Sequence, residues 1–151
     1  MQLKSLDDTK QFSKKISNII KPGDIICLYG EIGVGKTTFV RFIINYLEYI
    51  NGIKSSEVLS PTFNIVYDYD IKNTKILHYD LYRLKNHQDI QQLGMFETSE
   101  NSIKIVEWPE LIKAKPINRI DILFSYSKSK DFRDVKINGF GKWKGYNFHE
   151  I

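Results

Sequence analysis

Residues 30–37 read Gly30-Glu31-Ile32-Gly33-Val34-Gly35-Lys36-Thr37, and this stretch sets the expectation for the whole chain. It matches the phosphate-binding loop pattern G-x-x-x-x-G-K-[ST] at every fixed position. The preceding residues 25–29 are apolar, as in a short buried strand. The following residues 38–47 carry apolar side chains at positions 39, 40, 43, 44 and 47, as one face of a helix does. Strand, glycine loop and helix in this order predict nucleotide binding rather than an accidental glycine-rich turn.

The residue types of the loop suit a bound triphosphate. Glycines let the backbone turn tightly and bring its N–H groups against phosphate oxygens. The helix that follows directs its N-terminal N–H groups and partial positive charge at the same anion. Lys36 supplies a full charge for the β- and γ-phosphates, and the Thr37 hydroxyl suits a magnesium ion that bridges them.

The composition is that of an ordinary globular protein, and we expect residues 1–151 to form a single domain. Of the 151 residues, 42% are hydrophobic and 26% charged, and the net charge of +4 is too small to indicate nucleic-acid binding by itself. The single cysteine, Cys27, cannot form an internal disulfide, which suits a reducing cytoplasm. Because no signal-peptide pattern or membrane-length apolar run occurs, we expect a cytoplasmic protein with no membrane partner.

Alternating helix and strand patterns predict an α/β, P-loop NTPase-like fold. Its central sheet is expected to be mixed and mostly parallel, flanked by helices, with one antiparallel hairpin. Residues 6–20 are predicted to form the first helix, with Thr9 as its N-cap. Strands at 64–69 and 75–80 are predicted to pair through a short turn. The remaining expected elements are a helix at 86–94, a strand at 103–107, a short helix at 108–112, and strands at 119–126 and 134–137, with no element assigned after residue 139.

Two carboxylates follow predicted strands. Asp80 comes directly after residues 76–79, and Glu107 comes directly after residues 103–106. Ligands of open α/β sheets bind at the carboxyl ends of strands, and a phosphate loop needs an acid there for the metal's water shell or the attacking water. We therefore take Asp80 and Glu107, with Lys36, as candidate catalytic residues. The alternative for each acid is a solvated strand end.

Other features remain ambiguous from the residues alone. The residues of Ser60-Pro61-Thr62 favour a simple proline turn, and a mobile loop that senses the γ-phosphate is the alternative. His78 lies in mid-strand without a second ligand at metal spacing, which favours a structural role. Trp108 suits the core or a surface anchor. The basic stretch 128–136 is interpreted as a solvated face, with nucleotide or RNA contact as the less favoured alternative.

Five segments together resemble the TsaE (YjeE) family, the ATPase subunit of the bacterial machinery that makes threonylcarbamoyladenosine in tRNA. They are residues 30–39, Ser60-Pro61-Thr62-Phe63, His78-Tyr79-Asp80-Leu81-Tyr82-Arg83-Leu84, Leu93-Gly94 and Val106-Glu107-Trp108-Pro109-Glu110. Their order and spacing agree with the family over most of residues 6–126. The His-x-Asp-x-Tyr-Arg and Glu-Trp-Pro segments are far more specific than the phosphate loop alone.

The resemblance implies magnesium-dependent hydrolysis of ATP to ADP and phosphate, with roles for named residues. The residues implied in binding the nucleotide along the loop are Glu31, Gly33, Val34, Gly35, Lys36, Thr37 and Thr38. Thr37 and Glu107 would ligate magnesium, and Asp80 would serve hydrolysis. Thr62 would belong to a nucleotide-sensing switch loop. Thr9 would lie near the base or sugar, and Trp108 at the rim of the active site.

The resemblance also implies partners. Family members act with the proteins TsaB and TsaD, of which TsaD transfers the threonylcarbamoyl group, so the chain would meet tRNA only indirectly through the complex. Hydrolysis by the ATPase would reset that complex between turnovers. The chain departs from the family at Phe42, where glycine is frequent, and after Tyr126, where no family motif occurs.

Two rival classes fit the residues less well. A small P-loop kinase generally clamps the transferred phosphoryl group with several arginines, whereas the four here are scattered. A nucleotide-dependent switch of the GTPase kind, with little intrinsic hydrolysis, would need Asp-x-x-Gly and Asn-Lys-x-Asp, and neither string occurs. We therefore expect ATP as the nucleotide, and slow hydrolysis by the isolated chain because no arginine finger is evident.

Overall fold

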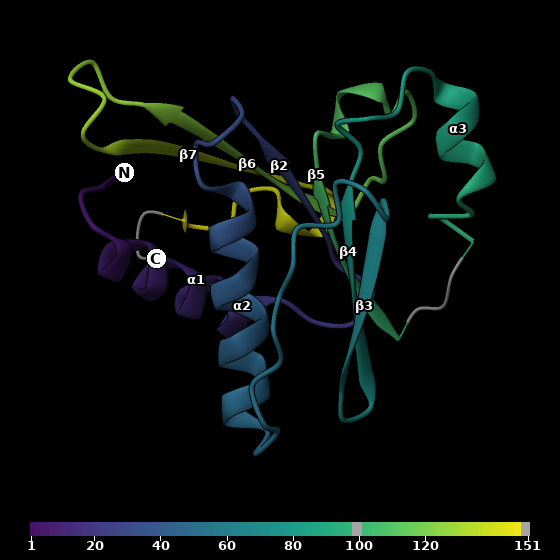
Figure 1. Ribbon diagram of the computed structural model, residues 1–151, viewed down its shortest axis with the longest axis horizontal. Helices are drawn as coiled ribbons and strands as arrows, with labels where there is room; N and C mark the ends of the chain where they lie inside the picture. The colour runs from purple at the N-terminus through teal and green to yellow at the C-terminus, as the bar shows by residue number, and fades with distance from the viewer. Residues whose placement is uncertain (98–100, 149–151) are drawn as a thin grey trace.

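A seven-stranded sheet forms the centre of the molecule, in a computed structural model that describes residues 1–97 and 101–148. The strands lie in the order β1-β7-β6-β2-β5-β4-β3 (Figure 1). Their bounds are β1 (Gln2–Leu3), β2 (Ile25–Tyr29), β3 (Val66–Ile71), β4 (Thr74–Asp80), β5 (Ser102–Glu107), β6 (Arg119–Tyr126) and β7 (Arg133–Phe140). The helices are α1 (Leu6–Ile19), α2 (Lys36–Ile50) and α3 (His87–Gln92), with short 3₁₀ turns η1 (Pro109–Leu111) and η2 (Gly141–Trp143). No helix in the described ranges is long and apolar enough to cross a bilayer.

The four central strands, β6, β2, β5 and β4, run parallel, and antiparallel neighbours complete both edges of the sheet. β3 pairs with β4 at one edge, while β7 pairs with β6 and β1 with β7 at the other. The predicted α/β fold, with a parallel centre and a hairpin joining β3 to β4, is confirmed. In Figure 1, α1 and α2 lie together and α3 lies apart from them.

Apolar side chains on both faces of β2 explain why residues 25–29 form a continuous apolar run. Successive side chains of a strand point to opposite faces. Ile26 and Leu28 therefore join the larger core cluster, which includes residues of α1 and α2. Ile25 and Cys27 join a second cluster, which includes Ile90 of α3. A strand buried on both faces is typical of a parallel sheet.

The first helix begins at a different cap from the one predicted. Ser5 is the N-cap, and its Oγ accepts a hydrogen bond from the backbone N–H of Asp8 at 3.0 Å. Thr9 lies inside the helix, where its hydroxyl donates to the Ser5 carbonyl at 3.2 Å. The prediction of Thr9 as the cap was wrong because the first buried residue of the helix is Phe12. Apolar periodicity therefore does not mark the first turn.

The last strand is longer than predicted, and the segment after it packs onto the sheet. Trp143 of η2 is only 8% exposed, and its Nε1 donates to Asp24 Oδ1 at 3.1 Å. The Lys142 ammonium lies 2.7 Å from the same oxygen. A Cβ on Gly139 would overlap the carbonyl oxygen of Trp143, so glycine permits this close approach. Trp143 and Asp24 are more than a hundred positions apart, so no local sequence pattern could predict this contact.

We expect Cys27 to resist thiol reagents in the folded protein. Its side chain is fully buried, and desolvation followed by the charge of Asp121 raises the pKa of the thiol to about 12. At pH 8 this lowers the thiolate fraction about a thousandfold relative to an ordinary cysteine, and the thiolate is the reactive form. Labelling with a chromogenic disulfide reagent should be slow in buffer and fast in concentrated urea. Equal rates in the two solvents would contradict the burial.

Candidate active site

The glycine loop joins the carboxyl end of β2 to Lys36, the first residue of α2. Gly33 and Gly35 have φ angles of 75° and 115°, in the left-handed region that favours glycine. Gly35 is the N-cap of α2 and provides no side-chain hydrogen bond to the first turn. A Cβ on Gly35 would meet nothing within 4 Å, so the backbone there faces open space. Helix N–H groups without a capping side chain, facing open space, fit a phosphate group.

The Lys36 side chain folds back over the loop that contains it. Its Nζ donates to the carbonyl oxygens of Gly30 at 2.6 Å and Glu31 at 3.0 Å, and lies 4.0 Å from the centroid of the Trp108 ring. The residue is 4% exposed, and this burial lowers the pKa of Lys36, although nearby carboxylates act in the opposite direction. A charge in such a partly desolvated position interacts strongly with an anion that reaches it.

Glu107 meets the first turn of α2. β5 runs parallel to β2 with Glu107 paired to Leu28, so the strand ends beside the start of the glycine loop. The Thr37 hydroxyl lies 2.9 Å from Glu107 Oε1 and 3.0 Å from Oε2. On the other side, His78 Nε2 lies 2.8 Å from Oε1. The carboxylate is therefore held between a helix and the neighbouring strand β4.

Asp80 ends β4 directly opposite Glu107 and has its own hydrogen bonds. The Thr62 hydroxyl donates to Asp80 Oδ2 at 2.6 Å, and the backbone N–H of Tyr82 donates to Oδ1 at 3.0 Å. Ser60 Oγ lies 2.8 Å from Thr62 Oγ1. The segment 60–62 is therefore more than a proline turn, because its threonine bonds an acid at the end of the sheet.

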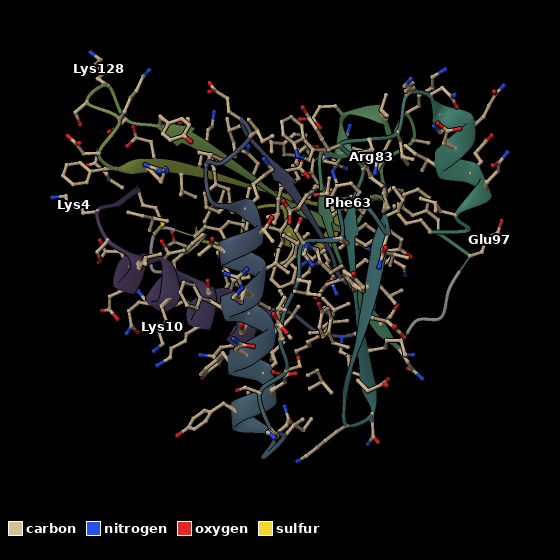
Figure 2. The ribbon with its side chains drawn as sticks, in the orientation of Figure 1. Lys4, Lys10, Phe63, Arg83, Glu97 and Lys128 are labelled. Carbon is tan, nitrogen blue, oxygen red and sulfur yellow. The ribbon has the colours of Figure 1, made fainter. Side chains whose placement is uncertain are left out.

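A cleft of about 260 Å³ contains most of the predicted site residues. Its lining is Ile32, Gly33, Gly35, Lys36, Thr37, Thr38, Ser60, Thr62, Asp80, Tyr82, Glu107 and Trp108. Lys36 is the one positively charged residue among the described residues that line it. Beside the cleft, Phe63 is 81% exposed, with the Arg83 guanidinium 4.9 Å from its ring centroid (Figure 2).

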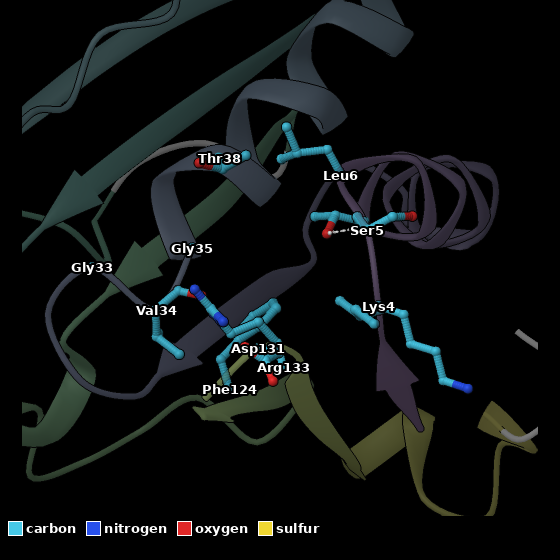
Figure 3. Close-up of a pocket in the computed structure, with 12 residues that line it drawn as sticks. Lys4, Ser5, Leu6, Gly33, Val34, Gly35, Thr38, Phe124, Asp131 and Arg133 are labelled. Atoms are coloured by element: carbon cyan, nitrogen blue, oxygen red, sulfur yellow. Dashed lines mark hydrogen bonds between the residues drawn. The ribbon is translucent and has the colours of Figure 1, made fainter. Parts of the chain in front are cut away.

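Thr9 and Val34 line a second cleft of about 280 Å³ at the glycine loop. Figure 3 shows this cleft, with Val34 on the loop. Lys4 and Ser5 from the segment before α1, and Leu6 at the first position of the helix, also line this cleft. Gly33, Gly35 and Thr38 line both clefts, so the loop and the start of α2 separate them. Glu31 lines neither cleft, and its carbonyl group instead accepts the bond from Lys36.

Arg133 contacts the glycine loop, and the sequence reasoning missed this contact. Its Nε donates to the Val34 carbonyl at 3.0 Å, and its guanidinium lies 4.3 Å from the centroid of the Tyr126 ring. The interpretation of residues 128–136 as a solvated face was therefore wrong for Arg133. The contact depends on the β6–β7 hairpin lying against a loop about a hundred residues away, so no local pattern could predict it.

The residues at the cleft fit a magnesium ion. In the described part of the chain no group of three or more His, Cys, Asp or Glu side chains could form an all-protein metal cage. Magnesium does not need one, because it usually keeps several waters and binds one or two carboxylates together with substrate phosphates. The Thr37 hydroxyl and the Glu107 carboxylate lie in contact beside the glycine loop and provide the oxygen atoms that this ion prefers.

Trp108 is expected to report nucleotide binding by fluorescence. Its ring contacts the Lys36 ammonium and lies 4.9 Å from the Tyr82 ring, so a phosphate that attracts the ammonium changes the ring's surroundings. The Trp143→Phe variant isolates this signal, because the chain has two tryptophans. Emission should change on titration with magnesium and ATP, whereas Trp108→Phe should give no such change. An unchanged signal at saturation would place the nucleotide elsewhere.

The glycine loop lies between a buried strand and a helix, at the carboxyl ends of the central parallel strands, of which β5 and β4 end in acids. These features are those of the P-loop NTPase fold class. The model of the family described as threonylcarbamoyl adenosine biosynthesis protein TsaE matches residues 3–135. The chain therefore belongs to the TsaE family.

Individual relatives agree with this assignment. The tRNA threonylcarbamoyladenosine biosynthesis protein TsaE of Rickettsia conorii is 41% identical over 111 residues, which cover 74% of this chain and 61% of the length of that protein. The protein of the same name from Borreliella burgdorferi is 35% identical over 143 residues, covering 92% and 98% of the two chains. The crystal structure of Bacillus subtilis YdiB superimposes with a TM-score of 0.72 at 26% identity, covering 94% of this chain and 85% of that one.

Proposed function

We propose that this protein is a magnesium-dependent ATP hydrolase that serves the threonylcarbamoyladenosine modification of tRNA. The proposal rests on one observation: Lys36 and Thr37, in the first turn of α2, lie in the same cleft as Glu107 at the end of β5 and Asp80 at the end of β4. Family membership supports the role in tRNA modification, since curated relatives carry that role in their names.

The proposed binding mode uses both sides of the glycine loop. The triphosphate lies along the loop, where the backbone N–H groups and the Lys36 ammonium neutralise its charge. The nucleoside extends into the second cleft beside Thr9, and the reacting end lies in the cleft that contains Asp80. Thr37 and Glu107 would hold the magnesium ion, which supplies charge neutralisation at the β- and γ-phosphates.

In the proposed hydrolysis, water attacks the γ-phosphorus, the bond to the β–γ bridging oxygen breaks, and ADP and phosphate are released. Asp80 orients the attacking water by accepting a hydrogen bond from it. Thr62, which bonds the same carboxylate, is positioned to respond when the γ-phosphate arrives or leaves.

We propose that the isolated chain hydrolyses ATP slowly. Phosphoryl transfer develops charge on the γ-phosphate oxygens, and fast P-loop enzymes neutralise it with a second cation such as an arginine finger. Of the described residues that line the cleft, Lys36 alone is positively charged. TsaB and TsaD are the proposed partners, tRNA is met through their complex, and the proposed location is the cytoplasm.

Reconstitution of the modification tests the function. The chain should co-purify with TsaB and TsaD in an ATP-dependent manner, and the complex should modify tRNA over repeated turnovers. Omitting the chain should stop modification after the first turnovers. Undiminished modification without the chain, or fast hydrolysis by the chain alone, would contradict the proposed role.

A further inference from the structure

His78 is a buried polar residue that the proposed hydrolysis does not use. It lies in the middle of β4, its side chain is 0% exposed, and its Nε2 lies 2.8 Å from Glu107 Oε1. An imidazole in such a position costs free energy that an apolar residue would not, unless its hydrogen bonds compensate. The contact with Glu107 is therefore the feature that needs an explanation.

The hydrogen bond fixes which nitrogen of the His78 ring carries the proton. Within residues 1–97 and 101–148, Nδ1 has no hydrogen-bond partner, whereas Nε2 faces a carboxylate oxygen. A buried N–H without an acceptor is costly, and a carboxylate can only accept. The proton therefore resides on Nε2, and the ring acts as a donor to Glu107.

The hydrogen bond from His78 Nε2 sets the direction of the Glu107 side chain. Glu107 and Asp80 are paired across β5 and β4, and like charges directly opposite each other in a sheet repel. His78 is on the same face of β4 as Asp80 and two residues before it, so its bond to Glu107 runs diagonally, away from Asp80. Asp80 is held separately by Thr62 and the N–H of Tyr82. The two acids thus have separate sets of donors.

We propose that His78 is a positioning residue that holds the Glu107 carboxylate against the Thr37 hydroxyl. The inference rests on the proposed function, in which these two oxygen-bearing groups hold magnesium. A glutamate side chain has several rotatable bonds, and donors on two elements leave it one arrangement. Removing a residue that hydrogen-bonds a metal ligand typically lowers metal affinity about 10- to 100-fold.

The first test uses the parent protein without nucleotide or metal. Long-range proton–nitrogen NMR of the ¹⁵N-labelled chain distinguishes the two ring nitrogens, and the signals of His78 are identified by their loss in His78→Gln. We expect Nε2 to carry a proton. An Nε2 without a proton would overturn the proposed donor.

The second test compares His78→Gln with His78→Leu. The glutamine amide nitrogen can donate from nearly the position of Nε2, whereas leucine cannot donate. His78→Leu should raise the magnesium concentration needed for half-maximal nucleotide binding about tenfold, read from Trp108 fluorescence. Nucleotide binding in excess chelator should stay at the parent level, and His78→Gln should restore much of the magnesium response.

Ile76→Ala provides the structural control, because Ile76 lies two residues before His78 on the same face of β4 and is also fully buried. It should lower the melting temperature without changing the magnesium requirement. A purely structural His78 would behave in the same way, and that result would overturn the proposal. If the parent binds nucleotide but does not hydrolyse it, the proposed function fails, while the NMR and binding results still decide the role of His78.

Discussion

Replacing Glu107 by glutamine is expected to lower magnesium-dependent ATP hydrolysis about a hundredfold or more. The substitution preserves the size of the side chain and removes the charge that lies 2.9 Å from the Thr37 hydroxyl. Binding without magnesium should be unchanged or tighter, because a carboxylate facing the triphosphate is removed. Phosphate release measures the first effect, and calorimetry in excess chelator measures the second.

Glu110→Gln is the matched control for this substitution. Glu110 is exposed in η1, three residues from Glu107, and lies outside the lining of the cleft. The same change of charge there should leave hydrolysis near the parent rate. Hydrolysis by Glu107→Gln at the parent rate would remove Glu107 from the site.

Replacing Lys36 by methionine is expected to weaken nucleotide binding strongly and to lower hydrolysis about a hundredfold or more. Methionine retains part of the apolar stem but removes the ammonium that would contact the phosphates. Stability should respond differently. Burial lowers the pKa of Lys36, so folding disfavours its charged form, and removing that charge should leave the melting temperature equal or higher at pH 7.

The pH dependence gives this prediction a further check. Where the folded pKa of a lysine is lowered, the unfolded chain binds more protons between that pKa and 10.5, so the parent gains stability from this residue as pH rises through that window. Lys36→Met should lack this gain, and urea unfolding at several pH values measures it. Lys10→Met, at an exposed position of α1, should change neither binding nor the pH profile. Normal ATP binding by Lys36→Met would contradict the assigned role.

Local sequence signals were sufficient for the parts of the site that are close together along the chain or lie at strand ends. The glycine loop depends on residue types within one turn, and Asp80 and Glu107 follow recognisable apolar strands. Parallel pairing then brings these acids to the edge where the loop begins. His78 also had a readable signal, since residues two apart in a strand share a face and it precedes Asp80 by two.

Contacts between distant segments explain what the sequence reasoning missed. Arg133 meets Val34 only because the β6–β7 hairpin lies beside the glycine loop, and Trp143 is buried only because η2 returns to Asp24. The two-residue strand β1 exists through its pairing with β7 and is too short to produce a periodic pattern. The cap of α1 required a choice between Ser5 and Thr9, both of which are good capping types.

The bond between Thr62 and Asp80 has a consequence for communication with other proteins. It joins Asp80, at the proposed reacting end of the cleft, to the segment that contains Thr62. The next residue of that segment is Phe63, which is largely exposed to solvent. In the proposed hydrolysis, a change at the γ-phosphate would therefore be separated from the exposed Phe63 by one hydrogen bond and one peptide unit. Under that proposal, a partner protein that contacts Phe63 would meet a surface that differs between the ATP and ADP states.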